Sequence, residues 1–190
     1  MSNNIEDFKI DELKNPRFIK TGFVTYKQNG IKKSWEVVKV HDSVAILIYH
    51  KEKNSFVLVK QFRPAVYMEN MGNGITVELC AGIIDKDLTL AEIAIEEIEE
   101  ECGYAIPLEN IEKITQVNNA VGFAGSKQTI FYTEVTESMR VNNGGGIDTE
   151  LIEVIEIPIS EVRKFMFDES IAKTTGLLFA IMWWIDKKEF

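Results

Sequence analysis

Residues 89–103 read Thr89-Leu-Ala-Glu-Ile-Ala-Ile-Glu-Glu-Ile-Glu-Glu-Glu-Cys-Gly103. Thr89 followed by Glu92 three residues later is a capping box, which marks the beginning of a helix. Gly103 is a typical stop, because glycine readily adopts the left-handed conformation that ends many helices. Apolar residues recur between the two ends at helical spacing. The stretch therefore predicts one strong helix.

The acidic residues of this helix do not all lie on its polar side. Its apolar face is marked by Leu90, Ile93, Ala94 and Ile98. At about 100° per residue, Glu97 and Glu101 project onto that face, and Glu100 lies at its edge. Burying clustered carboxylates without a counter-charge is costly, and oxygen ligands without histidine or thiolate suit Mg²⁺ or Mn²⁺. A metal site is one interpretation; a solvated acidic face is the alternative that the spacing leaves open.

Alternating and β-branched runs predict strands on both sides of the helix. They are a hairpin at 23–26 and 35–40, a second hairpin at 44–49 and 56–62, and single strands at 76–80, 112–118, 128–135 and 151–157. Residues 68–74 and 144–146 predict loops, the second of them flexible. One or two helices close the chain. The pattern indicates a mixed β-sheet layered with helices.

Length, composition and charge exclude several classes of protein. At 190 residues, 45% of them hydrophobic, the chain is long enough for one compact domain and too short for two. A formal net charge of −9 argues against nucleic-acid binding, so an anionic substrate needs local positive charge or metal ions. The longest apolar stretch, 176–185, is about half of the ~20 residues that cross a bilayer, and no secretory signal opens the sequence. We expect a cytoplasmic protein that binds neither nucleic acid nor membrane.

The segment from Gly82 to Tyr104 resembles the Nudix box, whose pattern is G-x5-E-x7-R-E-U-x-E-E-x-G-U. The register matches at Gly82, Glu97, Ile98, Glu100, Glu101 and Gly103. It departs at Leu88, where the box has a glutamate, and at Glu96, where it has an arginine that helps orient the carboxylates. The resemblance implies a hydrolase that uses Mg²⁺ to cleave a diphosphate bridge.

Other segments narrow the resemblance to one branch of the family. The ADP-ribose and UDP-sugar diphosphatases are similar at 33–39, 59–66 and 77–82. The UDP-glucose diphosphatases, a group that tolerates a degenerate box, are similar at 41–43, 101–104, 125–129 and 131–135. The likeness runs from about Tyr26 to Thr175.

The resemblance implies an α/β fold, the Nudix α/β/α sandwich with a mixed sheet, preceded by an N-terminal antiparallel sheet. Residues 1–190 are expected to form a single Nudix hydrolase domain. In it, 1–40 form the N-terminal sheet region used for dimerisation, and 41–190 form the catalytic Nudix fold. The implied assembly is a homodimer.

The same resemblance assigns the metal ligands. Glu97 and Glu101 are the expected principal ligands of Mg²⁺, Glu100 is a supporting ligand within the catalytic group, and the Ala81 carbonyl is another ligand. Mn²⁺ is an expected substitute. Clustered metal ions neutralise charge on the bridging phosphates and make a water nucleophilic.

The general base of the family lies on a mobile loop shortly before a strand. Here that region is 144–153, in which Glu150 is the first choice and Asp148 the alternative. A hinge at Gly144–Gly146 would let either carboxylate swing in after substrate binds. An ordinary polar surface loop is the other interpretation of this segment.

Substrate contacts are implied for Trp35, Arg63, Glu78, Gly82, Ser126 and Lys127. Arg63 matches an arginine that contacts the diphosphate, with a surface ion pair as its alternative. Trp35 matches a tryptophan that stacks on the nucleobase, with core packing as its alternative. Glu78 is expected to face substrate or metal. Ser126 and Lys127 lie in a loop expected to contact the sugar or the distal phosphate.

The expected substrate is a small nucleotide sugar. We predict hydrolysis of UDP-glucose or a similar compound to a nucleoside monophosphate and a sugar 1-phosphate. One alternative is an ADP-ribose diphosphatase that produces AMP and ribose 5-phosphate. The other is a catalytically weak module that binds nucleotide sugars.

Overall fold

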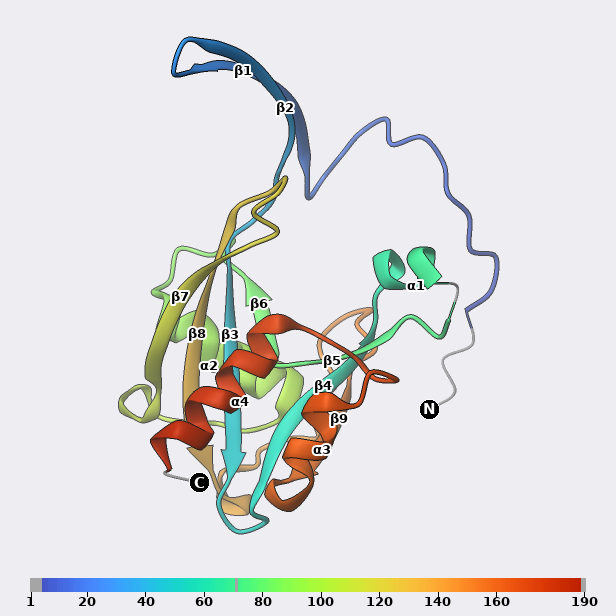
Figure 1. The fold of residues 1–190 in the computed structure, drawn as a ribbon. Coiled ribbons are helices and arrows are strands. Elements are labelled where there is room, and N and C mark those ends of the chain that lie inside the picture. Colours follow the sequence, from blue (N-terminus) through green and yellow to red (C-terminus); the bar gives the residue numbers. More distant parts are fainter. Residues whose placement is uncertain (1–4, 71, 189–190) are drawn as a thin grey trace.

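The strands form two sheets in the computed structural model, which describes residues 5–70 and 72–188 (Figure 1). The smaller sheet is an antiparallel hairpin of β1 (Lys20–Gln28) and β2 (Ile31–Lys39). The larger contains β3 (Ser43–His50), β4 (Ser55–Phe62), β5 (Ile75–Glu78), β6 (Cys80–Ile83), β7 (Glu112–Asn119), β8 (Ser126–Val135), β9 (Glu153–Pro158) and β10 (Ala172–Lys173).

The larger sheet is mixed. Its strands follow the order β10-β5-β4-β3-β8-β7, with β6 paired to β3 and β9 paired to β4. β3 runs parallel to β8, and β10 parallel to β5, whereas the other pairs are antiparallel. The helical elements are α1 (Pro64–Asn70), α2 (Leu90–Glu97), a π-helical turn (Ile98–Cys102), α3 (Val162–Phe167), α4 (Thr175–Lys187) and short 3₁₀ turns at Leu108–Asn110, Glu137–Met139 and Ile159–Glu161.

Helices cover both faces of this sheet. Side chains alternate along β3, so Val44 and Ile46 pack on one face with Ile93 of α2, while Leu47 packs on the other with Leu177 of α4. Figure 1 shows α3 and α4 on the near side of the sheet and α2 behind it. The predicted α/β/α sandwich with a mixed sheet and a separate N-terminal antiparallel sheet is confirmed.

The capping box predicted at the start of α2 is confirmed. The Thr89 hydroxyl accepts from the Glu92 N–H at 3.3 Å, and the Glu92 carboxylate accepts from the Thr89 N–H at 2.8 Å. Gly103, with φ of 79°, ends the helical segment as expected. The predicted single helix, however, changes from α to π at Ile98.

The β1–β2 hairpin projects from the rest of the molecule (Figure 1). Almost all of its residues are exposed, among them Phe23, Ile31 and Trp35. Its contacts with the β7–β8 connection include bonds from the Trp35 indole N–H to the Gly122 carbonyl at 2.6 Å and from the Val38 N–H to the Phe123 carbonyl at 2.8 Å.

Two sequence expectations need correction. The loop predicted at 68–74 is wrong in its first part, because α1 extends to Asn70. Pro64 occupies the first helical position, where its missing N–H costs nothing, and Tyr67 packs edge-on against Phe8 and tilted against Phe62. The two-residue strand β10 was not predicted, since a segment that short carries no periodicity. In the described segments, no helix is long and apolar enough to span a bilayer.

Replacing Thr89 by alanine should lower the free energy of unfolding by about 1 kcal/mol, because one N–H at the start of α2 loses its acceptor. Urea denaturation followed by circular dichroism measures this change. Glu92→Gln, which keeps an acceptor for the Thr89 N–H, is the control and should cost less. Equal losses in the two variants would contradict the capping role of the Thr89 hydroxyl.

Candidate active site

Two carboxylates of the acidic helix are packed against the strand that precedes it. Glu101 is 3% exposed, and its Oε2 accepts from the Ala81 N–H of β6 at 2.9 Å. Glu97 lies over Gly82, where a Cβ would stand 1.9 Å from Glu97 Oε1. Gly82 is therefore needed for close packing. The solvated-face interpretation is wrong for Glu97 and Glu101, whereas Glu99 is exposed.

Burial changes the proton affinity of both carboxylates. Loss of hydration, followed by the charge of Glu100, raises the pKa of Glu97 to about 7. Loss of hydration raises the pKa of Glu101 to about 8, although the hydrogen bond from Ala81 opposes this rise. The charge of Glu150 contributes to both increases. Both side chains thus bind a proton more tightly than an exposed glutamate does, and the charge of Lys86 only partly opposes this for Glu97.

Arg63 and Glu78 form a bidentate ion pair beside these carboxylates. Arg63 Nε and Nη2 donate to the two oxygens of Glu78, each at 2.7 Å. Burial acts to raise the pKa of Glu78, but the hydrogen bonds and charge of Arg63 outweigh it, so that pKa is lowered. The ion-pair alternative for Arg63 is therefore present, and the pair fixes the plane of its guanidinium. The charge of Glu101 is one of the causes that raise the pKa of Arg63.

Thr76 belongs to the same cluster, and the sequence analysis did not identify it. Its hydroxyl donates to Glu78 Oε1, and the residue is buried. Thr76 precedes Glu78 by two residues in β5, so both side chains point to the same face of the sheet. This spacing is the signal that would have found it.

The loop that carries Glu150 is docked on the acidic helix. The Gly145 N–H donates to the Glu101 carbonyl at 2.9 Å, and the Gly146 N–H to the Glu100 carbonyl at 3.1 Å. A Cβ at Gly144 would lie 2.2 Å from the Glu101 carbonyl oxygen. The predicted loop is present, but its glycines fit against the helix end in left-handed conformations instead of forming a free hinge.

Of the two candidates for the general base, Glu150 lies in the better electrostatic position. Its charge contributes to the raised pKa values of Glu97 and Glu101, whereas that of Asp148 is not among their causes. Glu150 Oε2 accepts from the Ile147 N–H at 3.1 Å, which closes a local turn. Asp148 is exposed and has a positive φ of 53°.

Glu96, which stands where the Nudix box has an arginine, forms a surface ion pair. Lys86 Nζ donates to Glu96 Oε2 at 2.6 Å. The hydrogen bond that Lys86 donates to Glu96, together with the charges of Glu100 and Glu97, raises the pKa of Lys86. Lys86, which precedes α2, thus places positive charge near Glu97 and Glu100, whereas Glu96 at the arginine position carries negative charge.

The remaining predicted substrate residues lie outside this cluster. Trp35 is 55% exposed in the hairpin, so the core-packing alternative is wrong. Ser126 opens β8 and is half-buried. Lys127 is exposed, and its backbone N–H donates to Asp42 Oδ1 at 2.7 Å.

The chemistry of the donor set at this site fits a hard divalent cation. Glu101 is a buried carboxylate and Glu97 a half-buried one, and oxygen ligands are those that Mg²⁺ prefers. In residues 5–70 and 72–188, however, no three His, Cys, Asp or Glu side chains form a ready metal-binding group. Glu97 and Glu101 are therefore the two side chains that could hold the cation, and the Ala81 carbonyl and Glu100 stay predicted ligands.

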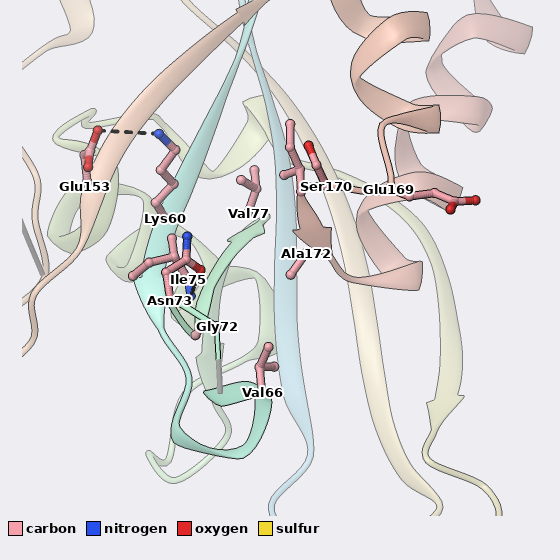
Figure 2. A pocket seen from close by; sticks show the side chains of 12 residues that line it. Lys60, Val66, Gly72, Asn73, Ile75, Val77, Glu153, Glu169, Ser170 and Ala172 are labelled. Carbon is pink, nitrogen blue, oxygen red and sulfur yellow. Dashed lines mark hydrogen bonds and ion pairs between the residues drawn. The ribbon is translucent and has the colours of Figure 1, made fainter. Parts of the chain in front are cut away.

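A cavity of about 650 Å³ lies on the opposite face of the sheet (Figure 2). It is lined by Val77, which belongs to the core beneath α3 and α4. Its one lining cation, Lys60, is 3.8 Å from the Glu153 carboxylate, as the dashed line shows. In the described lining the carboxylates of Glu153 and Glu169 outnumber this cation, which does not favour the binding of an anion.

Comparison with known proteins identifies the family. No family model matches the chain. The uridine diphosphate glucose pyrophosphatase NUDT14 of Bos taurus is 40% identical, over 83% of this chain and 84% of the relative. Its Mus musculus counterpart is 38% identical over 85% and 86%. The GDP-mannose pyrophosphatase of Pectobacterium atrosepticum is 35% identical over 94% of each chain. Similarity of this degree over most of each relative shows that the chain belongs to the Nudix hydrolase family.

Proposed function

We propose that this hydrolase cleaves the diphosphate bond of UDP-glucose in a Mg²⁺-dependent reaction, giving UMP and glucose 1-phosphate. The observation that carries the proposal is the pair of buried Glu101 and half-buried Glu97, packed on Ala81 and Gly82 beside Arg63. The names of the relatives support a nucleotide-sugar substrate. UDP-glucose ranks first because the two NUDT14 relatives are the more similar.

The residues of the cluster have different proposed roles in binding the substrate and the metal. Arg63 provides a guanidinium that would bind phosphate oxygens, and its two hydrogen bonds to Glu78 fix the plane of that guanidinium. Glu97, Glu101 and the Ala81 carbonyl, supported by Glu100, would hold Mg²⁺. When bound, Mg²⁺ supplies charge neutralisation at the diphosphate and lowers the pKa of a coordinated water.

Glu150 is the proposed general base. Its loop is docked on the carbonyls of Glu100 and Glu101, so its carboxylate has only to leave the Ile147 N–H to reach a water near the cluster. Asp148 is the less favoured choice, because its charge is not among the causes named for the raised pKa values of Glu97 and Glu101, whereas that of Glu150 is. Trp35, Ser126 and Lys127 are kept as proposed contacts for the base, sugar or distal phosphate.

Turnover of UDP-glucose should require Mg²⁺ and fall at least about 100-fold in Glu97→Gln, Glu101→Gln and Glu150→Gln, the usual size of such losses. Chromatographic detection of UMP and glucose 1-phosphate measures it, with GDP-mannose and ADP-ribose as competing substrates. Glu99→Gln is the matched control, since Glu99 is an exposed carboxylate of the same turn. Equal turnover in EDTA would refute the metal requirement. Binding of UDP-glucose without turnover would favour the catalytically weak module.

The stability of the metal-free protein should fall as pH rises from about 5 to 8. Glu97 and Glu101 have pKa values of about 7 and 8 in the folded state, above the ordinary 4.5. The folded state therefore binds more protons than the unfolded state in this window, and ionisation at higher pH destabilises it. Thermal unfolding in EDTA at several pH values measures the slope. The Glu97→Gln, Glu101→Gln double variant should flatten it, and an unchanged slope would contradict the assigned pKa values.

We also propose that the chain forms a homodimer through the β1–β2 hairpin. A two-stranded sheet is marginally stable alone in water, yet this one exposes Phe23, Ile31 and Trp35 and receives little cover from its own domain. A second copy would bury these side chains. The exposed apolar surface of the hairpin, which a dimer would bury, is the reason for the proposal.

Sedimentation equilibrium should give twice the chain mass of 21.7 kDa for the wild type. Phe23→Asp should shift it towards the monomer, because a buried unpaired charge weakens an apolar interface. Phe167→Asp is the matched control, as Phe167 is an exposed phenylalanine outside the hairpin. A wild-type monomer, or dimers that survive Phe23→Asp, would exclude the hairpin interface.

A further inference from the structure

A second pocket, distinct from the carboxylate cluster, lies at the base of the projecting hairpin. Its volume is about 640 Å³. The charged side chains in its lining include those of Arg17, Lys20, Lys39, Asp42 and Lys127. Its apolar wall includes Ile84, two residues beyond Gly82, and Leu90 at the start of α2. The pocket therefore adjoins the segment that leads into the acidic helix.

The charge of this pocket is opposite to that of the protein. Four cationic side chains line it in a chain of formal net charge −9. The lining carboxylate, Asp42, accepts through Oδ1 from the backbone N–H of Lys127 at 2.7 Å. Across the described residues, Arg17, Lys20, Lys39 and Lys127 form no side-chain ion pair, whereas Lys53, Lys86 and Lys187 each do. The pocket thus holds concentrated positive charge that the described protein does not neutralise.

The register of the hairpin adds an independent observation. Lys20 and Lys39 are direct cross-strand partners at the open end of β1 and β2. Like charges directly opposite each other destabilise a sheet. Both lysines line the pocket, so an anion placed there would relieve this repulsion.

We propose that this pocket binds a phosphate dianion, either inorganic phosphate or the phosphate of a monoester. Compact lysine ammonium groups and one planar guanidinium suit a tetrahedral anion with several acceptor oxygens. A diphosphate hydrolase would release two phosphate monoesters next to the pocket. Binding itself, however, requires neither turnover nor metal, so the inference is independent of the proposed function.

The test is titration of the full chain, in EDTA, with inorganic phosphate and separately with glucose 1-phosphate. Amide chemical shifts report binding, and ionic strength is held constant because salt screens exposed charges. Titration to about 10 mM would saturate about 90% of a site with a Kd of about 1 mM. Tighter binding of glucose 1-phosphate indicates a monoester ligand, and equal or weaker binding indicates free phosphate; either result supports the site if the shifts are saturable and centre on the pocket.

The decisive variant is Lys20→Gln, Lys39→Gln, which should weaken binding at least about tenfold, as expected for lost charge-assisted hydrogen bonds. Its matched control is Lys27→Gln, Lys32→Gln. Those lysines are also direct cross-strand partners in the hairpin but lie outside this pocket. Absence of saturable binding, or equal weakening in the two double variants, would overturn the proposal. Glu97→Gln should bind phosphate like the wild type, which separates this result from any failure of catalysis.

Discussion

The fold around the proposed catalytic centre depends on one constraint, the packing of two carboxylates of like charge, one buried and one half-buried, against β6. Glu101 is held by the Ala81 N–H, and Glu97 occupies the space that a side chain at position 82 would need. The repulsion and lost hydration are visible in the raised pKa values of both groups. A fold that maintains this arrangement gains nothing in stability from it at neutral pH. The proposed cation, when bound, would convert the unfavourable charges into ligands.

The π-helical turn connects this constraint to the loop of the general base. Its carbonyls at Glu100 and Glu101 receive the N–H groups of Gly146 and Gly145, so one segment presents carboxylates from its side chains and anchors the loop with its backbone. A side chain at Gly144 would collide with that backbone. The glycines therefore fix the start of the turn that carries Glu150, the proposed general base.

The sequence allowed much of this to be predicted because the signals were local. The capping box, the helical period and Gly103 defined the acidic helix, and angular projection alone brought Glu97 and Glu101 to the buried face. The π turn could not be foreseen, because it arises where the helix end docks on residues 142–146, far away in sequence. The pairing of Arg63 with Glu78 was not predicted for the same reason, because the two residues are brought together by the pairing of β4 with β5. For Arg63 the sequence left two interpretations, an ion pair and a phosphate ligand. The structure contains the ion pair with Glu78, and phosphate binding by the same guanidinium stays a proposal.

The distribution of positive charge resolves the problem that an acidic chain poses for an anionic substrate. Arg63 is placed beside the buried carboxylates by Glu78, and Lys86 carries charge to the helix where the box arginine is replaced by Glu96. Both cations are engaged by carboxylates, so their fields act close to the site and do little beyond it. The lysines at the base of the hairpin differ, because none is paired in the described chain and two directly oppose each other. Their field extends into an open pocket, and an anionic ligand is the simplest counter-charge for it.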